Sequence, residues 1–232
     1  MRIVVNHLTR MSGPHICVAG VDGQGRSVRP VLDRSRLRRS LLRSEGGPFA
    51  LGVVVDLGRP RPRPVAPEVE DVVFEPWSTA VAGRLDDAGF LRVLDVVAAN
   101  SLRAVFGPEL VRMSGTAAAV PEGSGNASLG VLRVRGADLV ALTRYDRPDL
   151  RVHFTDPDFG DLRIKVTDLR LWEDDHVTPA TVNIERIEGM LEDCFLAVGL
   201  TRGFQVSSYE GVWHWLQINN VFPVADPLWE RE

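Results

Sequence analysis

Residues 2–32, RIVVNHLTRMSGPHICVAGVDGQGRSVRPVL, carry the clearest pattern of secondary structure in the sequence. Three segments within it, residues 2–8, 15–21 and 26–32, are short, rich in Val and Ile, and bounded by Gly or Pro. These features are typical of β-strands. The intervening Asp22-Gly23-Gln24-Gly25 is a hairpin turn signal. With a further strand expected at residues 49–57, the N-terminal part of the chain is predicted to be a small β structure.

Outward from this stretch, strands predominate and helices are few. We expect helices over residues 33–44, 86–106 and 180–191, and an extended loop over the alternating Arg and Pro of residues 58–67. Residues 114–130 are poor in large apolar side chains and rich in Gly, Ala and Ser, which predicts a linker or long loop. Further strands are expected at residues 129–135, 139–145, 151–155, 161–167, 169–172, 194–200 and 212–219.

Each half of the chain therefore has about five short strands and one helix, which is the element count of a small OB-fold barrel. The predicted fold is mainly β with a few helices, arranged as two small OB-like β-barrels in tandem. The expected boundaries are 1–113 for the first barrel with its helix, 114–130 for the linker and 131–232 for the second barrel.

A short repeat supports this duplication. The tripeptide Leu-Thr-Arg occurs at Leu8-Thr9-Arg10, Leu142-Thr143-Arg144 and Leu200-Thr201-Arg202. Composition alone predicts about 0.1 copies in a chain of this length. An apolar strand precedes the first and third copies, so Arg10 and Arg202 are predicted to occupy equivalent places in two related barrels.

Composition excludes several protein classes. With 232 residues, of which 44% are hydrophobic and 25% charged, the chain is an ordinary globular one, neither disordered nor fibrous. Its longest apolar runs are seven residues, at 49–55 and 194–200, too short for a membrane span. The polar Asn6, His7 and Arg10 argue against a signal peptide. Cys17 and Cys194 are expected to be buried free thiols, and the expected location is cytoplasmic.

Charge is unevenly distributed. Residues 1–63 contain twelve arginines and four acids, a net charge of +8, whereas residues 64–232 carry a net charge of -12. Five of the arginines, Arg34, Arg36, Arg38, Arg39 and Arg43, lie within ten residues. Such a basic segment suits an anionic partner such as a nucleic-acid backbone. The alternative is a solvated helix face without a binding role.

The sequence lacks the usual catalytic and metal-binding signatures. There is no Cys-x-x-Cys pair, no Walker loop and no Gly-x-Ser-x-Gly elbow, and the five histidines are scattered. The acidic groups Asp156/Asp158 and Glu173-Asp174-Asp175 are expected to be solvated loops. We therefore expect no cofactor, no metal ion and no catalytic residue, although an enzyme is not excluded.

Four segments, residues 6–10, 26–31, 199–204 and 213–219, have side chains suited to binding. Amide, imidazole, hydroxyl and guanidinium groups can contact phosphates or base edges, and aromatic rings can stack on bases. The candidate ligand-binding residues are Asn6, His7, Thr9, Arg10, Arg29, Thr201, Arg202, Trp213, Trp215, Gln217 and Asn219. The competing interpretation is structural, with the arginines in ion pairs and the tryptophans in the core. Trp77, Trp172 and Trp229 stand alone and are expected to pack.

The last of these segments lies on a predicted strand, residues 212–219. Because side chains alternate along a strand, His214, Leu216 and Ile218 should face one side and Trp213, Trp215 and Gln217 the other. The second set, with Asn219, would line a groove if the first set faces the core.

Several of these segments resemble the bacterial dual-OB-containing domain family. The resemblance rests on VNHLTRM at residues 5–11, ICVAGVD at 16–22, VRPV at 28–31, AVGLTR at 197–202 and HWLQINN at 214–220. It covers both ends of the chain, whereas residues 60–130 carry no recognised motif. It implies two OB-like barrels in tandem and a nucleic-acid or nucleotide recognition module linked to bacterial conflict and defence systems. It implies no catalytic residues.

The leading hypothesis is a non-enzymatic module that binds nucleic acid or a nucleotide-like ligand and no membrane. A second hypothesis is a protein-interaction adaptor, in which the basic and acidic parts dock a protein partner. A third is a flavin-binding split-barrel oxidoreductase with Thr and Arg holding the cofactor phosphate. A yellow preparation would favour the third, and absence of nucleic-acid binding at low salt would favour the second.

Overall fold

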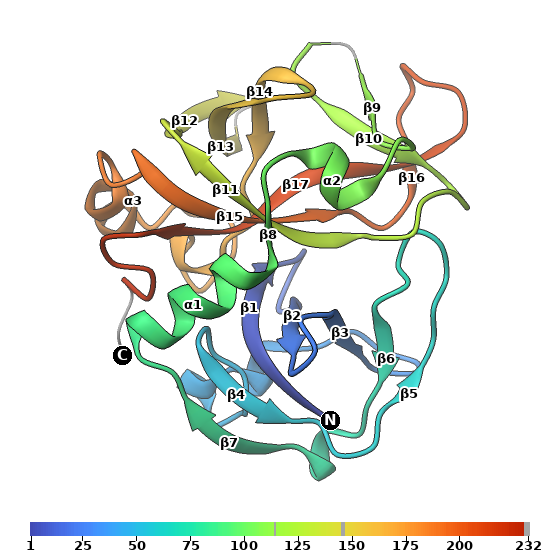
Figure 1. The fold of residues 1–232 in the computed structure, drawn as a ribbon, viewed down its shortest axis with the longest axis vertical. Helices are drawn as coiled ribbons and strands as arrows, with labels where there is room; N and C mark the ends of the chain where they lie inside the picture. The colour runs from blue at the N-terminus through green and yellow to red at the C-terminus, as the bar shows by residue number, and fades with distance from the viewer. Residues whose placement is uncertain (114, 145–146, 230–232) are drawn as a thin grey trace.

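The computed structural model describes residues 1–113, 115–144 and 147–229. Its N-terminal half is a curled seven-stranded sheet with the strand order β5-β6-β3-β2-β1-β4-β7 (Figure 1). Most neighbours are antiparallel, but β3 and β6 run parallel. The strands are β1 (Arg2–Arg10), β2 (Ile16–Asp22), β3 (Ser27–Val31), β4 (Val53–Asp56), β5 (Arg61–Pro62), β6 (Asp71–Val73) and β7 (Ala80–Arg84).

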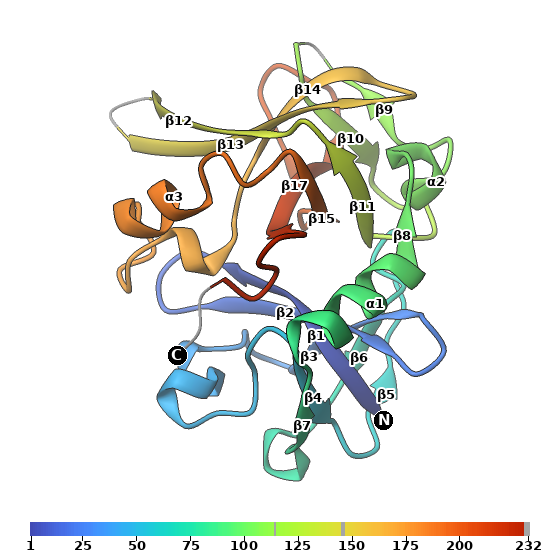
Figure 2. The ribbon, with the colours of Figure 1, turned by 60° about the vertical axis from the view of Figure 1, so that its left-hand side comes forward.

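The C-terminal half contains a second seven-stranded sheet, with the order β8-β11-β15-β17-β10-β9 and with β16 paired to β17. Its strands are β8 (Ala98–Ala99), β9 (Val111–Arg112), β10 (Ala118–Pro121), β11 (Leu129–Arg135), β15 (Asp193–Leu200), β16 (Phe204–Gln205) and β17 (Val212–Pro223). A three-stranded sheet packs against it, formed by β12 (Asp138–Arg144), β13 (Arg147–Asp156) and β14 (Gly160–Lys165). Figure 2 shows this small sheet on the side of the second half that faces away from the first.

The described residues form few helices. The α-helices are α1 (Asp87–Val97), α2 (Leu102–Phe106) and α3 (Thr181–Ile187), and the 3-10 turns are η1 (Arg39–Leu41), η2 (Arg43–Glu45), η3 (Pro76–Ser78) and η4 (Leu169–Leu171). Helix α1 crosses from the first half to the second (Figure 1). The prediction of a mainly β chain with a few helices is confirmed. Within the described ranges no helix is long and apolar enough to cross a membrane.

The helix expected over residues 33–44 is not formed. Its backbone is already used elsewhere, because Leu37 O accepts from Ile16 N at 3.0 Å and Arg38 bridges to His15. The chain then folds into η1 and η2, and Gly46, with φ of 86°, ends the second turn. Tertiary pairing with the sheet therefore overrides helix propensity here.

Two further elements differ from expectation for similar reasons. The helix expected over residues 86–106 is interrupted where Ala98 and Ala99 pair parallel with β11, and Ser101 then caps α2. The strand expected over residues 169–172 is η4, whose first turn is capped by the Asp168 carboxylate.

The two halves have separate cores joined by a shared apolar seam. The first core contains inward residues of β1–β4 together with Phe90 and Leu94 of α1. It also contains side chains of the second sheet, including Phe195 and Phe222, and the Phe90 and Phe222 rings lie 5.1 Å apart in a T-shaped contact. Burial of each such side chain contributes about 1.5–3 kcal/mol, so the halves stabilise each other.

The proposed domain boundaries stay a prediction. Within the expected linker, the structure places β10, which pairs with β17, and residues Leu102 and Phe106 pack in the second core although they precede residue 113.

Candidate nucleic-acid interface

Strands β1 and β17 meet at the seam between the two halves, where a side-chain amide takes the place of a neighbouring strand. Leu8 N donates to Asn220 Oδ1 at 2.7 Å, and Asn220 Nδ2 donates to Leu8 O at 3.1 Å. Asn220 is fully buried, and the amide satisfies both backbone groups of Leu8. Two positions farther on, Arg10 N donates to Thr167 O at 2.9 Å. The end of β1 is thus held by the second half along three residues.

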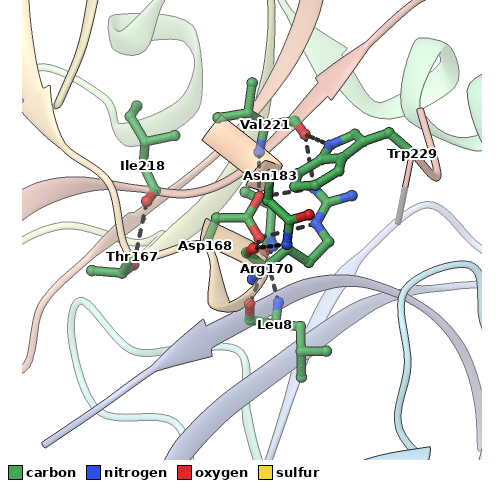
Figure 3. A network of polar contacts seen from close by, with 9 residues as sticks. Leu8, Thr167, Asp168, Arg170, Asn183, Ile218, Val221 and Trp229 are labelled. Atoms are coloured by element: carbon green, nitrogen blue, oxygen red, sulfur yellow. Dashed lines mark hydrogen bonds and ion pairs between the residues drawn. The ribbon is translucent and has the colours of Figure 1, made fainter. Parts of the chain in front are cut away.

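A buried ion pair fixes η4 to this seam (Figure 3). Arg170 donates from Nε and Nη2 to the two oxygens of Asp168 at 3.0 and 2.8 Å. Asp168 Oδ2 also accepts from Val221 N at 3.0 Å, and Arg170 Nη2 donates to Val221 O at 2.8 Å. The Asp168 side chain is 0% exposed and that of Arg170 is 5% exposed. Because both charges are desolvated, removal of either partner would strongly destabilise the folded protein.

Three predicted site residues form a chain of polar contacts across the seam. Asn219 Nδ2 lies 2.9 Å from His7 Nδ1, and Gln217 Nε2 donates to Asn219 Oδ1 at 2.9 Å. Since an amide nitrogen is a donor, His7 Nδ1 is assigned as the acceptor, which places the imidazole proton on Nε2. Gly199 makes room for this chain, because a Cβ there would lie 2.4 Å from Asn219 Nδ2.

His7 is expected to make the protein sensitive to mild acid. Burial, with the Arg29 charge as a second cause, lowers the pKa of His7 to about 3 from 6.5. The folded state therefore keeps the imidazole neutral, whereas the unfolded chain takes up a proton near pH 6.5. This stability contribution is complete above pH 6.5 and is lost as the pH falls toward 3. Between pH 7 and pH 5, His7 is expected to remove about 2 kcal/mol from the free energy of unfolding.

The measurement is urea unfolding of the parent protein and of His7→Gln at both pH values. The variant cannot titrate and should lose about 2 kcal/mol less than the parent between them. His15→Gln is the control, because the His15 ring lies near the surface and bonds only to Ser12 O in the described part of the chain. Equal pH dependence of the parent and His7→Gln contradicts the prediction.

Beside the polar contacts of His7, Asn219 and Gln217 lies a group of oppositely charged residues from both halves. Asp71 accepts from buried Arg29 and, at 2.8 Å, from Arg202 Nη2. Arg202 Nη1 also lies 3.3 Å from Glu68 Oε1, which His214 Nδ1 approaches to 3.4 Å. The Arg29 side chain is 4% exposed, whereas that of Arg202 is 51% exposed. The carboxylates thus neutralise Arg29, and only Arg202 keeps a surface available to a ligand.

The first and third copies of Leu-Thr-Arg each send an arginine into the other half. Arg10, at the end of β1, places its guanidinium carbon 3.3 Å from the ring centroid of Trp172 and donates to His176 O. Arg202, just after β15, reaches Asp71 and Glu68 of the first half. Both arginines therefore contribute to the association of the two halves. The second copy ends β12 in the small sheet.

Four aromatic side chains lie together around the start of β17, and we call them the aromatic cluster. It consists of Phe204, Tyr209, Trp213 and Trp215. Phe204 pairs with Trp213 across β16 and β17, and the Trp215 ring lies 6.3 Å from that of Phe204 and 5.3 Å from that of Tyr209. The Phe204 side chain is 48% exposed, and both tryptophans are half-buried. The cluster thus presents flat apolar rings to solvent on an ordered strand.

The alternation predicted for this strand is confirmed up to residue 218. His214, Leu216 and Ile218 are buried, whereas Trp213, Trp215 and Gln217 are half-buried on the opposite face. Asn219 continues the second set but is covered by His7. Thr201 supports this arrangement, because its Oγ1 accepts from Trp215 N at 2.9 Å.

Comparison with known families agrees with this geometry. A family model described as "Dual OB-containing domain" matches residues 1–221. The chain belongs to the dual OB-containing domain family. No curated protein and no solved structure matches the chain. The predicted resemblance and the predicted tandem of OB-like barrels are therefore confirmed.

In OB-folds the ligand usually lies across the face of strands 2 and 3. In this dual OB-containing domain, the face of the first barrel that carries His7, Arg29 and Asp71 is turned toward the second barrel. Five of the eleven predicted site residues are nearly fully buried. Those with less than 4% exposure are Asn6, His7, Thr9, Arg29 and Asn219. Several of their polar atoms have no hydrogen-bond partner in the described structure, namely both amide atoms of Asn6, Nε2 of His7 and Nη2 of Arg29.

Five predicted residues stay at least partly exposed on the second barrel: Thr201, Arg202, Trp213, Trp215 and Gln217. On the first barrel, Arg10 is also partly exposed, and it stacks on Trp172. Sequence reasoning missed Phe204 and Tyr209, which complete the cluster, and the carboxylates of Glu68 and Asp71. Phe204 could have been found from its position two residues after Leu200-Thr201-Arg202. The carboxylates left no local signal, because they meet their arginines only through the tertiary fold.

The predicted basic surface of the first barrel is reduced by ion pairs. Arg2, Arg26, Arg29, Arg39 and Arg63 each have a carboxylate partner within 4.0 Å. Six other arginines are exposed and have no ion-pair partner in the described part of the chain: Arg34, Arg36, Arg38, Arg43, Arg59 and Arg61. The uncompensated charge thus lies on the loops after β3 and β4.

Among the lone tryptophans, the packing prediction is wrong for one. Trp172 and Trp229 are buried, but Trp77 is 83% exposed on η3, where Pro76 begins a short surface turn. Within the described ranges, no group of three or more His, Cys, Asp or Glu side chains could hold a metal ion.

Proposed function

We propose that this dual OB-containing domain binds single-stranded nucleic acid, with bases stacking on the aromatic cluster. The observation that carries the proposal is the grouping of exposed Phe204 with half-buried Trp213 and Trp215 on one strand pair. Every base has a flat face, so aromatic platforms bind single strands with little sequence preference. Gln217 follows on the same face of β17 and offers an amide to a base edge.

Phosphate contacts would come from nearby positive charge. Arg202 lies two residues before Phe204 and has a half-exposed side chain. Its pairing with Asp71 and Glu68 orients the guanidinium without covering it. The exposed arginines of the first barrel would add longer-range attraction, which is screened by salt.

Further details belong to the same proposal. They are a non-enzymatic role and a place in a bacterial conflict or defence system, as the family resemblance implies, and a cytoplasmic location, as the two free cysteines suggest. The exposed aromatic cluster favours the nucleic-acid hypothesis over the flavin and adaptor hypotheses, because rings on an open strand suit a flexible strand of bases.

Trp215→Ala is expected to weaken binding of an unstructured single-stranded DNA oligonucleotide by about tenfold, since stacking on an aromatic side chain contributes about 1–3 kcal/mol per base. The measurement is quenching of intrinsic fluorescence at low salt, with the melting temperature recorded in parallel. Phe204→Ala, at a more exposed position, should also weaken binding and is the second variant if Trp215→Ala unfolds.

Trp77→Ala is the matched control, because Trp77 is an exposed tryptophan outside the aromatic cluster. It should leave affinity unchanged. In the parent protein, log K should fall with log salt by about 0.7 for each phosphate neutralised. Parent-like affinity of both cluster variants, or no quenching in the parent protein, refutes the proposal.

A further inference from the structure

A cavity of about 290 Å³ lies between the barrels, away from the aromatic cluster. One wall comes from the first barrel, along residues 39–51, and the opposite wall from residues 169–174 of the second. Leu8 of β1, Arg84 of β7 and Leu228 complete the lining. Leu8 and Arg170, two of these residues, lie close together in Figure 3.

The lining combines apolar surface with positive charge. Its apolar residues are Leu8, Leu42, Phe49, Ala50, Leu51, Leu169, Trp172 and Leu228. Four arginines line it, Arg39, Arg43, Arg84 and Arg170, against one carboxylate, that of Asp174. This composition suits a small molecule with an apolar or aromatic body and a negatively charged group.

Several donors in this lining have no acceptor. The guanidinium groups of Arg43 and Arg84 are exposed and have no hydrogen-bonding or ionic partner among the residues that the structure describes. Arg170 Nη1 and Trp172 Nε1 are buried and also lack one. A buried donor without an acceptor is unfavourable. A ligand that supplies acceptor oxygens would therefore be stabilised here.

The other charges of the cavity hold it in shape. Arg39 donates from Nε to Glu45 Oε1 at 3.0 Å and from Nη1 to Asp174 O at 3.1 Å, so it joins the two barrels across the cavity. Arg170 is fixed by Asp168. The walls are therefore positioned before a ligand arrives, which lowers the entropic cost of binding.

We propose that this cavity binds a nucleoside monophosphate unit, with the phosphate on Arg43 and Arg84 and the base against the apolar wall. Guanidinium groups match phosphate oxygens in pairs, and the apolar wall around Ala50 and Leu169, its two partly exposed apolar residues, matches a flat base. The volume is at the lower limit of small-molecule sites, which admits one nucleotide and excludes a dinucleotide. The unit can be a free nucleotide or the phosphorylated end of a strand.

This inference does not depend on the strand-binding proposal, because the cavity and the aromatic cluster share no residue. The full chain is titrated calorimetrically with each of the four ribonucleoside 5′-monophosphates and with inorganic phosphate. We expect at least one nucleotide to bind more tightly than phosphate. Arg43→Gln with Arg84→Gln should weaken that binding at least about tenfold, the factor for losing one charge-assisted contact.

Two further variants separate a site in the cavity from general attraction. Ser44→Trp places a large ring at an exposed lining position and should abolish nucleotide binding. Arg59→Gln with Arg61→Gln removes two equally exposed arginines outside the cavity and should leave binding unchanged. Trp215→Ala should also leave it unchanged, so failure of this inference can be distinguished from failure of the strand-binding proposal.

The source of the unit is resolved by comparing 5′-phosphorylated and 5′-hydroxyl forms of one short oligonucleotide in the Trp215→Ala background. If only the phosphorylated oligonucleotide competes with the bound monophosphate, the natural ligand is the phosphorylated end of a strand. If neither oligonucleotide competes, the natural ligand is a free nucleotide. The inference is overturned if no monophosphate binds more tightly than phosphate, or if Ser44→Trp binds it as the parent does.

Discussion

Replacing Asp168 with alanine is expected to lower the free energy of unfolding by about 3–5 kcal/mol, the cost of breaking a buried ion pair at one end. The carboxylate is 0% exposed and accepts from Arg170 N, from two guanidinium nitrogens and from Val221 N. Without it, the Arg170 charge stays buried with only the Val221 carbonyl as an acceptor among the described residues. The measurement is urea unfolding at pH 7.

The double variant Asp168→Leu with Arg170→Met distinguishes the loss of an ion pair from the loss of packing. A buried pair replaced by apolar residues of similar volume is often neutral, so this variant should regain the part of the loss that comes from the unpaired Arg170 charge. It should not regain the part that comes from the Arg170 and Val221 amides, which still lack their acceptor. Arg26→Ala is the surface control. Arg26 pairs with Asp22 at 2.7 Å but is 65% exposed, and its loss should cost no more than about 1 kcal/mol. A loss of similar size for Asp168→Ala and Arg26→Ala contradicts the prediction.

The strands of this chain could be predicted because their signal is local. Alternating or continuous apolar residues bounded by Gly and Pro predicted β1, β2, β3, β11 and β15 with every end within two residues of the observed bound. The helix over residues 33–44 failed because its competitor is tertiary: Leu37 and Arg38 pair with the start of β2. No local pattern reports that pairing.

The candidate site shows the same limit. The residue types of the site were evident from the sequence, and the structure does bring His7, Arg29, Arg202 and Asn219 together. Their burial was not evident, because it depends on partners more than 40 residues away, such as Asp71 for Arg29. The exposed side of β17 was predictable, since alternation along a strand is local.

The seam has a consequence for binding. The second barrel covers the face of the first barrel that carries His7, so the two barrels act as one unit unless the seam opens. Binding by the aromatic cluster requires no such opening, because Phe204 is exposed and Trp213 is partly exposed in the closed arrangement. Ligand access to Asn6 or His7, in contrast, requires separation of β1 from β17.

Asn220→Ala is expected to lower the free energy of unfolding by about 2–6 kcal/mol, the cost of two unsatisfied buried groups. The variant removes the only hydrogen bonds that the structure describes for Leu8 N and Leu8 O outside the pairing of β1 with its own sheet. Each buried group left unsatisfied costs about 1–3 kcal/mol. Asn220 is 0% exposed, so solvent does not reach Leu8 N and Leu8 O in the folded protein. The lost hydrogen bonds therefore cannot be replaced without local opening.

Hydrogen exchange distinguishes local loss of the Leu8 hydrogen bonds from a general loss of stability. In Asn220→Ala the Leu8 amide should exchange faster, relative to global unfolding, than the amides of Val18 and Val53, which lie within the first barrel's own sheet. Asn100→Ala removes an exposed asparagine and should change neither stability nor exchange. If Leu8 keeps its relative protection in Asn220→Ala, the amide bridge is not what joins β1 to β17, and the apolar contacts around Phe90 and Phe222 hold the barrels together by themselves.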